Sequence, residues 1–151
     1  AESIFKVLAR IRGHGPRAKV MLAKCKAEIN SFEACEELLR EIFKGENEPV
    51  AEELQAAFVF HTMGLRKQAI QELSKIVNEH PDLPSACLFL GDVFCEAGKL
   101  DKASYCWKLA TKRDRRGGGV ASAARKQLDR AVKQMKKAAQ NGSQKAKKKR
   151  K

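Results

Sequence analysis

Residues 88–110 read LFLGDVFCEAGKLDKASYCWKLA, which has the pattern of two short helices joined by a turn. Small and apolar residues recur every three or four positions on both sides of Gly98, as on one face of a helix. Gly98 can end the first helix, because glycine adopts the left-handed backbone conformation at little steric cost. Gly91 and Ala103 leave room for two helices to cross closely. The segment therefore predicts a helical hairpin.

The same pattern appears again when the sequence is compared with itself at a fixed shift. Under a shift of 34 residues, the matched pairs are Ala57 with Gly91, Phe60 with Phe94, Gly64 with Gly98, Ala69 with Ala103, Leu73 with Trp107, and Ile76 with Ala110. A period of this length is typical of helical repeat arrays. Pro81 closes one unit, and Pro84 suits the first turn of the next helix. We therefore predict hairpins at 50–83 and 84–117.

This pattern resembles the tetratricopeptide repeat (TPR) family, whose units are helix-turn-helix hairpins of about 34 residues. The residues that carry the resemblance most strongly are Leu90, Gly91, Phe94, Gly98, Ala103, Trp107 and Ala110. A degenerate first repeat is expected at 16–49, where only Leu22, Ala23, Leu39 and Ile42 stay in phase. The resemblance implies an all-α fold, with antiparallel hairpins stacked as a short right-handed solenoid.

The segments outside the repeats are interpreted separately. Residues 1–15 are expected to form an N-terminal helix, the remnant of an upstream repeat in a longer chain. Residues 118–140 are expected to form a basic helix that caps the solenoid's open edge. Its apolar side, at about 100° per residue, would consist of Val120, Ala124, Leu128, Ala131 and Met135. Residues 141–151 are expected to be a disordered Lys-rich tail.

In the TPR family, the first helices of the hairpins line a concave groove that binds peptides or partner helices. Carried over to this sequence, the resemblance implies a groove lined by Arg17, Val20, Met21, Lys24, Leu54, Gln55, Phe58, His61, Leu88, Phe89 and Asp92. Phe58 and Phe89 are candidate anchors for an apolar helix, although aromatic residues at helical spacing also pack in cores. Family members that hold the C-terminal tails of chaperones use a clamp of Lys, Arg and Asn. Chaperone-tail binding is disfavoured here, because most clamp positions hold Val20, Gln55, Ser85 and Phe89.

The net charge of +13 is concentrated at the C-terminal end of the chain. Residues 1–111 carry a net charge of −1, whereas 112–151 carry +14. The candidate contacts to nucleic acid or to an acidic partner are Arg125, Lys126, Arg130, Lys133, Lys136, Lys137, Lys145, Lys147, Lys148, Lys149, Arg150 and Lys151. Residues 145–151 resemble a nuclear localisation signal, and the same cations suit sequence-independent phosphate binding. Because no aromatic residue follows Trp107, base stacking is not expected in this region.

Other function classes lack support in the sequence. The longest uncharged run is the twelve residues 54–65, shorter than the roughly 18 that a membrane-spanning helix needs, so no integral membrane contact is expected. The five cysteines, Cys25, Cys35, Cys87, Cys95 and Cys106, and the three histidines show no metal-ligand or catalytic spacing. We therefore expect no metal, no cofactor and no enzymatic activity. The odd cysteine count and the lack of a secretory signal favour a reducing compartment, either nucleus, cytoplasm or organelle matrix.

Two functions remain in competition. The leading hypothesis is a non-enzymatic adaptor or scaffold that binds a protein or peptide in the solenoid groove and contacts an acidic partner through its basic C-terminus. The alternative is a structural, RNA-associated subunit of a ribonucleoprotein complex, such as a ribosome or its assembly intermediate. A third interpretation places the cationic amphipathic helix on an anionic membrane or in calmodulin.

Overall fold

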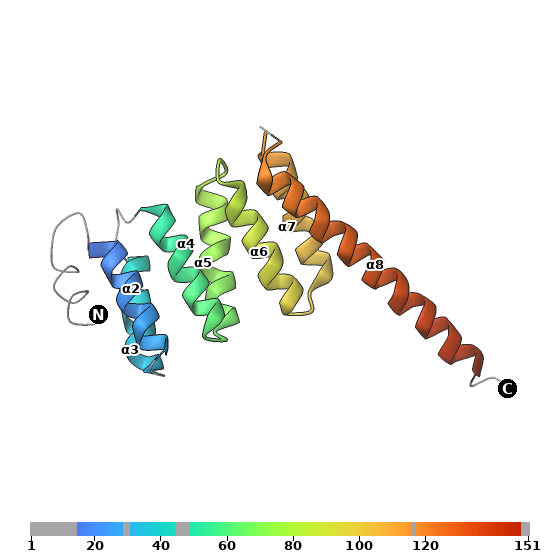
Figure 1. Ribbon diagram of the computed structural model, residues 1–151, viewed down its shortest axis with the longest axis horizontal. Coiled ribbons are helices and arrows are strands. Elements are labelled where there is room, and N and C mark those ends of the chain that lie inside the picture. Colours follow the sequence, from blue (N-terminus) through green and yellow to red (C-terminus); the bar gives the residue numbers. More distant parts are fainter. Residues whose placement is uncertain (1–14, 29–30, 45–48, 116, 149–151) are drawn as a thin grey trace. The chain divides into compact units, whose positions relative to one another are not determined.

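The computed structural model describes residues 15–28, 31–44, 49–115 and 117–148, and side chains are described between residues 17 and 141 of these ranges. All regular elements in these ranges are α-helices, which confirms the predicted all-α class (Figure 1). Except for Gly15, the predicted N-terminal helix at 1–15 lies outside the described residues, as do residues 149–151. The helices are α2 (Gly15–Glu28), α3 (Phe32–Lys44), α4 (Val50–Thr62), α5 (Arg66–Glu79), α6 (Pro84–Glu96), α7 (Leu100–Arg113) and α8 (Gly119–Lys148).

These helices fall into two compact units. Unit 1 is Ala1–His80 and unit 2 is Pro81–Lys151. In unit 1, α2 packs against α3, α4 packs against α5, and α4 also contacts both α2 and α3. In unit 2, α6 packs against α7, and α8 contacts both of them. The predicted helical hairpins are therefore present.

Two identical turns close the hairpins α4–α5 and α6–α7. Gly64 and Gly98 have φ angles of 78° and 74°, in the left-handed region that favours glycine. In the second turn, the Lys99 amide donates to the Phe94 carbonyl oxygen at 2.9 Å, and the Gly98 amide donates to the Cys95 carbonyl oxygen at 2.9 Å. The first turn repeats both bonds 34 residues earlier. This pair of bonds is the Schellman motif, which satisfies the last carbonyls of a helix.

The core of unit 1 joins its two helix pairs through apolar side chains. Its members are Val20, Ala23, Cys35, Leu39, Ile42, Ala56, Val59, Phe60 and Ala69. The rings of Phe43 and Phe60 stack with centroids 5.8 Å apart. Stacked aromatic pairs at this separation stabilise a core beyond their buried area. The weakly patterned α2–α3 pair is thus tied to the clearer α4–α5 pair.

The core of unit 2 is centred on Trp107, which is 1% exposed. Its indole Nε1–H donates to Asp92 Oδ1 at 2.9 Å, so the buried polar atom is satisfied. Gly91 lies directly against the indole ring, where a Cβ atom would come within 2.5 Å of Trp107 Cδ1 and Nε1. The close helix crossing expected at Gly91 is therefore present.

Asp114 caps the N-terminal end of helix α8. The backbone amide of Ala121 donates to Asp114 Oδ2 at 2.9 Å, which satisfies one of the amides left without a partner at a helix start. Ala121, Ala124 and Ala131 are buried against the rest of unit 2, whereas Met135 is 37% exposed. The first half of α8 thus covers unit 2, as expected for a capping helix.

The C-terminal boundary of α8 differs from our expectation. We predicted that helical order ends at residue 140, but α8 continues to Lys148. A glycine inside a helix costs about 1 kcal/mol relative to alanine. The residues around Gly142 are mostly Ala, Gln and Lys, which are strong helix formers and offset that cost.

Candidate partner-binding surfaces

The predicted groove residues of α2 are not all at the surface. Arg17 is exposed, while Met21 and Lys24 are partly buried. Val20 is completely buried in the core of unit 1, so a partner cannot touch it and we withdraw it from the predicted groove. The sequence pattern could have revealed this, because Val20 and Ala23 share a helical face with the in-phase core residues of the repeat.

On α4, the predicted groove residues form a mixed surface. Phe58 is 50% exposed, and Gln55 is exposed beside it on the same helix. Leu54 and His61 are partly buried. Phe58 lies on the opposite side of α4 from the buried Ala56 and Phe60, so half of its ring is accessible to a partner. It remains a candidate anchor.

In unit 2, the predicted groove residues of α6 are more tightly engaged. Leu88 and Phe89 are partly buried. The Asp92 carboxylate accepts the hydrogen bond from Trp107 described above. Asp92 therefore has a structural role that sequence reasoning missed, because its partner Trp107 lies on the neighbouring helix, 15 residues away.

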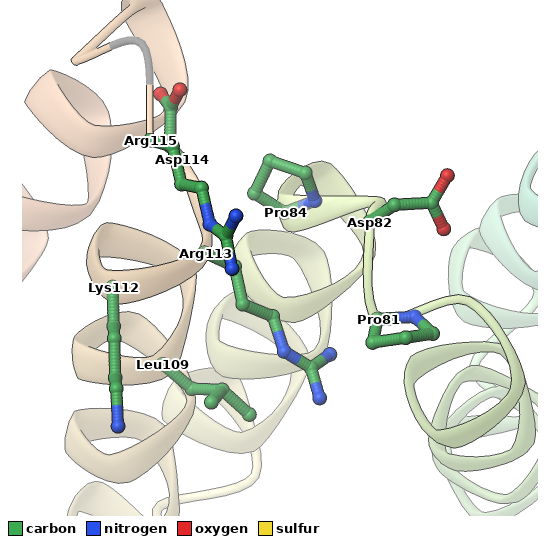
Figure 2. A pocket seen from close by; sticks show the side chains of 8 residues that line it. All are labelled: Pro81, Asp82, Pro84, Leu109, Lys112, Arg113, Asp114 and Arg115. Carbon is green, nitrogen blue, oxygen red and sulfur yellow. The ribbon is translucent and has the colours of Figure 1, made fainter.

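A cavity that the sequence did not predict lies within unit 2, between the N-terminal end of α6 and the C-terminal end of α7. It has a volume of about 830 Å³ and is lined by Pro81, Asp82, Pro84, Leu109, Lys112, Arg113, Asp114 and Arg115. Figure 2 shows the guanidinium groups of Arg113 and Arg115 extending to the same side of α7, while the Asp82 carboxylate points away from them. The arrangement suits a polar or acidic group, but its walls come from the start of α6, the last turns of α7 and the residues next to them, which no short motif marks.

Two of the charged residues in this cavity already have structural contacts. Asp114 caps α8. Arg113 Nη1 donates to Cys87 Sγ at 3.2 Å. Burial raises the pKa of Cys87, and the neighbouring Arg113 charge partly opposes that rise. The Arg113 side chain thus links the cavity wall to the core of unit 2.

The predicted cationic surface of α8 is exposed where its side chains are described. Arg125, Lys126, Arg130, Lys133, Lys136 and Lys137 are all exposed. Lys145, Lys147 and Lys148 lie in the helix without described side chains, and Lys149, Arg150 and Lys151 lie outside the described residues. By sequence, unit 2 has 19 Lys/Arg against 6 Asp/Glu, whereas unit 1 has 12 of each. The whole net charge of the protein therefore belongs to unit 2.

The cysteines are free thiols, and three of them are buried. Cys35 Sγ donates to the Ala23 carbonyl oxygen at 3.1 Å and lies 3.1 Å from Met63 Sδ. Burial, with a smaller effect from Glu36, raises the pKa of Cys35 to about 11. Burial, with a smaller effect from Cys87, raises the pKa of Cys106 to about 11 as well. Thiols that stay protonated near neutral pH act as small core side chains.

No three His, Cys, Asp or Glu side chains among the described residues gather in a way that could bind a metal ion. None of the helices in the described ranges combines the length and apolar character needed to span a bilayer.

The sequence matches no protein-family model and no curated protein. Among solved structures, the crystal structure of MamA is similar, with a TM-score of 0.59 and 16% sequence identity. The similarity covers 92% of this chain and 89% of the MamA chain. At this identity the likeness concerns the fold alone. Together with the paired helices, it shows that the fold is a TPR-like helical repeat.

Proposed function

We propose that this protein is a non-enzymatic interaction scaffold that binds a protein or peptide through the first helices of its hairpins. The observation that carries the proposal is the half-exposed Phe58 on α4, a first helix of the repeat. Large aromatic side chains that are partly exposed are common anchors of protein interfaces. The fold itself supports an interaction role, since helical repeats offer extended surfaces.

Phe58→Ala in the full-length chain tests this surface. We expect proteins captured from a native lysate by the wild-type chain to be depleted about tenfold by Phe58→Ala, because an interface anchor commonly contributes this much or more to affinity. Tyr105→Ala is the matched control, because Tyr105 is 68% exposed but lies on α7, a second helix. Equal recovery of partners with both variants, measured by quantitative mass spectrometry, would contradict a groove centred on first helices.

In the same proposal, the basic helix α8 gives the scaffold a second, acidic contact. The exposed cations of α8 support this role, since clustered charges of one sign attract an oppositely charged surface. Lys133→Glu, Lys136→Glu and Lys137→Glu together should weaken that contact while leaving Phe58-dependent partners bound. Charge reversal is preferable to removing α8, because α8 buries Ala121, Ala124 and Ala131 and its deletion would expose the core of unit 2.

The second candidate function is an RNA-associated structural subunit, which the row of exposed cations on α8 also favours. Each phosphate contact contributes about 0.7 to 0.9 to the slope of log affinity against log salt. Several contacts along α8 therefore predict a steep slope and little sequence preference. A flat salt dependence, or capture that nuclease does not change, excludes this candidate.

A further inference from the structure

Helix α8 occupies the place of the first helix of another hairpin. It begins at Gly119, about one repeat length after the start of α6 at Pro84. It contacts both helices of the α6–α7 pair, as α4 contacts both helices of the α2–α3 pair in unit 1. At the position equivalent to the turn glycines Gly64 and Gly98, which follow α4 and α6, α8 has Val132. Valine is strongly disfavoured in the left-handed conformation, so the chain continues as a helix and does not turn back.

Within the described residues no helix turns back onto α8, and one side of α8 carries exposed apolar side chains. Leu128 is partly buried, Val132 is 46% exposed and Met135 is 37% exposed. At about 100° per residue, these three side chains share a strip of roughly 60° on the helix. The strip continues the line of Ala121, Ala124 and Ala131, which is buried against unit 2. The apolar strip is therefore an extension of an existing helix interface.

The apolar strip has a cationic border. Arg125 is one heptad before Val132 and Lys136 is one turn after it, so both side chains flank the strip on the same side. All described side chains from Val132 to Asn141 are exposed, and Asp129 is the one acidic residue in the α8 sequence. A partner that fits must therefore bring both apolar and acidic groups.

We propose that the strip of Leu128, Val132 and Met135 binds an acidic amphipathic helix of a protein partner, which packs on α8 as α5 packs on α4 and α7 packs on α6. The inference rests on the proposed scaffold function and specifies its acidic contact. A nucleic acid backbone satisfies the cations but leaves Val132 and Met135 in water. A second copy of this chain would bring another cationic α8 to the strip, and like charges oppose that pairing.

The test uses the full-length chain and a fluorescent 21-residue peptide with Leu at the two apolar heptad positions and Glu at most others. A scrambled peptide of equal composition lacks the apolar face. We expect the wild-type chain to bind the amphipathic peptide. Val132→Ser/Met135→Ser should lower this affinity at least about tenfold, since both changes remove apolar contact that the peptide would bury. Gln134→Ser/Gln140→Ser is the matched control and should leave affinity unchanged. Anisotropy titration measures all six combinations of these three proteins with the two peptides.

The charge contribution has its own matched pair of variants. Arg125→Glu/Lys136→Glu, on the border of the strip, should weaken peptide binding about tenfold or more. Lys126→Glu/Lys133→Glu, on the opposite face, changes the net charge equally and should weaken binding less than threefold. Equal effects of the two variants would show unspecific attraction and overturn the inference.

Equal affinity for the scrambled peptide, or no binding of either peptide, would also overturn the inference. Two further results would overturn it by identifying a different occupant. One is a dimer in sedimentation that Val132→Ser/Met135→Ser dissociates, and the other is Val132- and Met135-dependent binding to a 16-base-pair RNA duplex or to phosphatidylserine vesicles. Phe58→Ala should not alter peptide binding. If Phe58→Ala loses partners from the lysate but the wild-type chain does not bind the peptide, the scaffold proposal stands and this inference alone is rejected.

Discussion

Gly91 shows at the residue scale how closely the helices of unit 2 approach. Its missing side chain leaves the space that the Trp107 indole fills, and the Trp107 Nε1–H then reaches Asp92. The sequence indicated the close crossing, because small residues recur at matched positions in both hairpins. It did not reveal the hydrogen bond, since the rotamers of Trp107 and Asp92 depend on packing between helices.

Gly91→Ala is expected to destabilise the protein by about 1–3 kcal/mol, because the added Cβ atom would overlap the indole ring. Gly119→Ala is the control, since a Cβ atom there meets no atom within 4 Å. Urea denaturation followed by circular dichroism measures both variants. A Gly91→Ala midpoint equal to that of the wild type would mean that the indole ring moves at no cost.

The buried thiols predict how stability depends on alkaline pH. An unfolded cysteine loses its proton near pH 8.5, whereas burial raises the pKa of Cys35 and Cys106 to about 11. Between these values the folded state binds more protons than the unfolded state, so stability falls as pH rises from about 8.5 to 11. Urea midpoints at several pH values measure the decline. Cys35→Ala/Cys106→Ala should lower overall stability but flatten this slope, and an unchanged slope would assign it to other groups.

At the scale of elements, the helix ends explain which predictions succeeded. The hairpins could be predicted because Gly64 and Gly98 determine the backbone of the turns locally. The sequence could not predict the burial of Val20 or the cavity between the start of α6 and the end of α7, since both depend on contacts between segments distant in sequence. The full length of α8 was missed because helix formers around Gly142 outweigh a local breaking signal.

The cap of α8 provides a prediction at this scale. Asp114→Ala removes the acceptor of the Ala121 amide and should cost about 1 kcal/mol. Asp114→Asn keeps an oxygen acceptor and should restore most of the stability. Asp82→Ala is the control, because Asp82 lines the same cavity, has the same charge and is exposed. Thermal unfolding compares the three variants. Equal losses for Asp82→Ala and Asp114→Ala would indicate that charge, and not the cap, is responsible.

At the scale of the whole molecule, charge is the most uneven property. Unit 1 is neutral and unit 2 carries the entire net charge of +13. The sequence predicted this asymmetry directly, because counting charges needs no structure. Which α8 cations share a face with the exposed Val132 became clear only once the helix and its packing were described.

Cation-exchange elution tests whether this asymmetry governs polyanion binding. Lys133→Glu/Lys136→Glu/Lys137→Glu and Lys44→Glu/Lys67→Glu/Lys75→Glu lower the net charge equally, and all six lysines are exposed. We expect the α8 variant to elute from phosphocellulose at clearly lower salt, because a dense patch dominates the attraction to a polyanion. Elution of both variants at the same salt concentration would mean that only total charge matters.

The paired turns also have a kinetic consequence. Every bond of the Gly98 turn joins residues three to five positions apart, and α6 and α7 then pack on each other directly. Structure built from such local contacts forms quickly, since little loop-closure entropy opposes it. During synthesis, the α6–α7 hairpin can therefore form before α8 is complete. The buried alanines of α8, Ala121, Ala124 and Ala131, can then pack against a hairpin that is already folded.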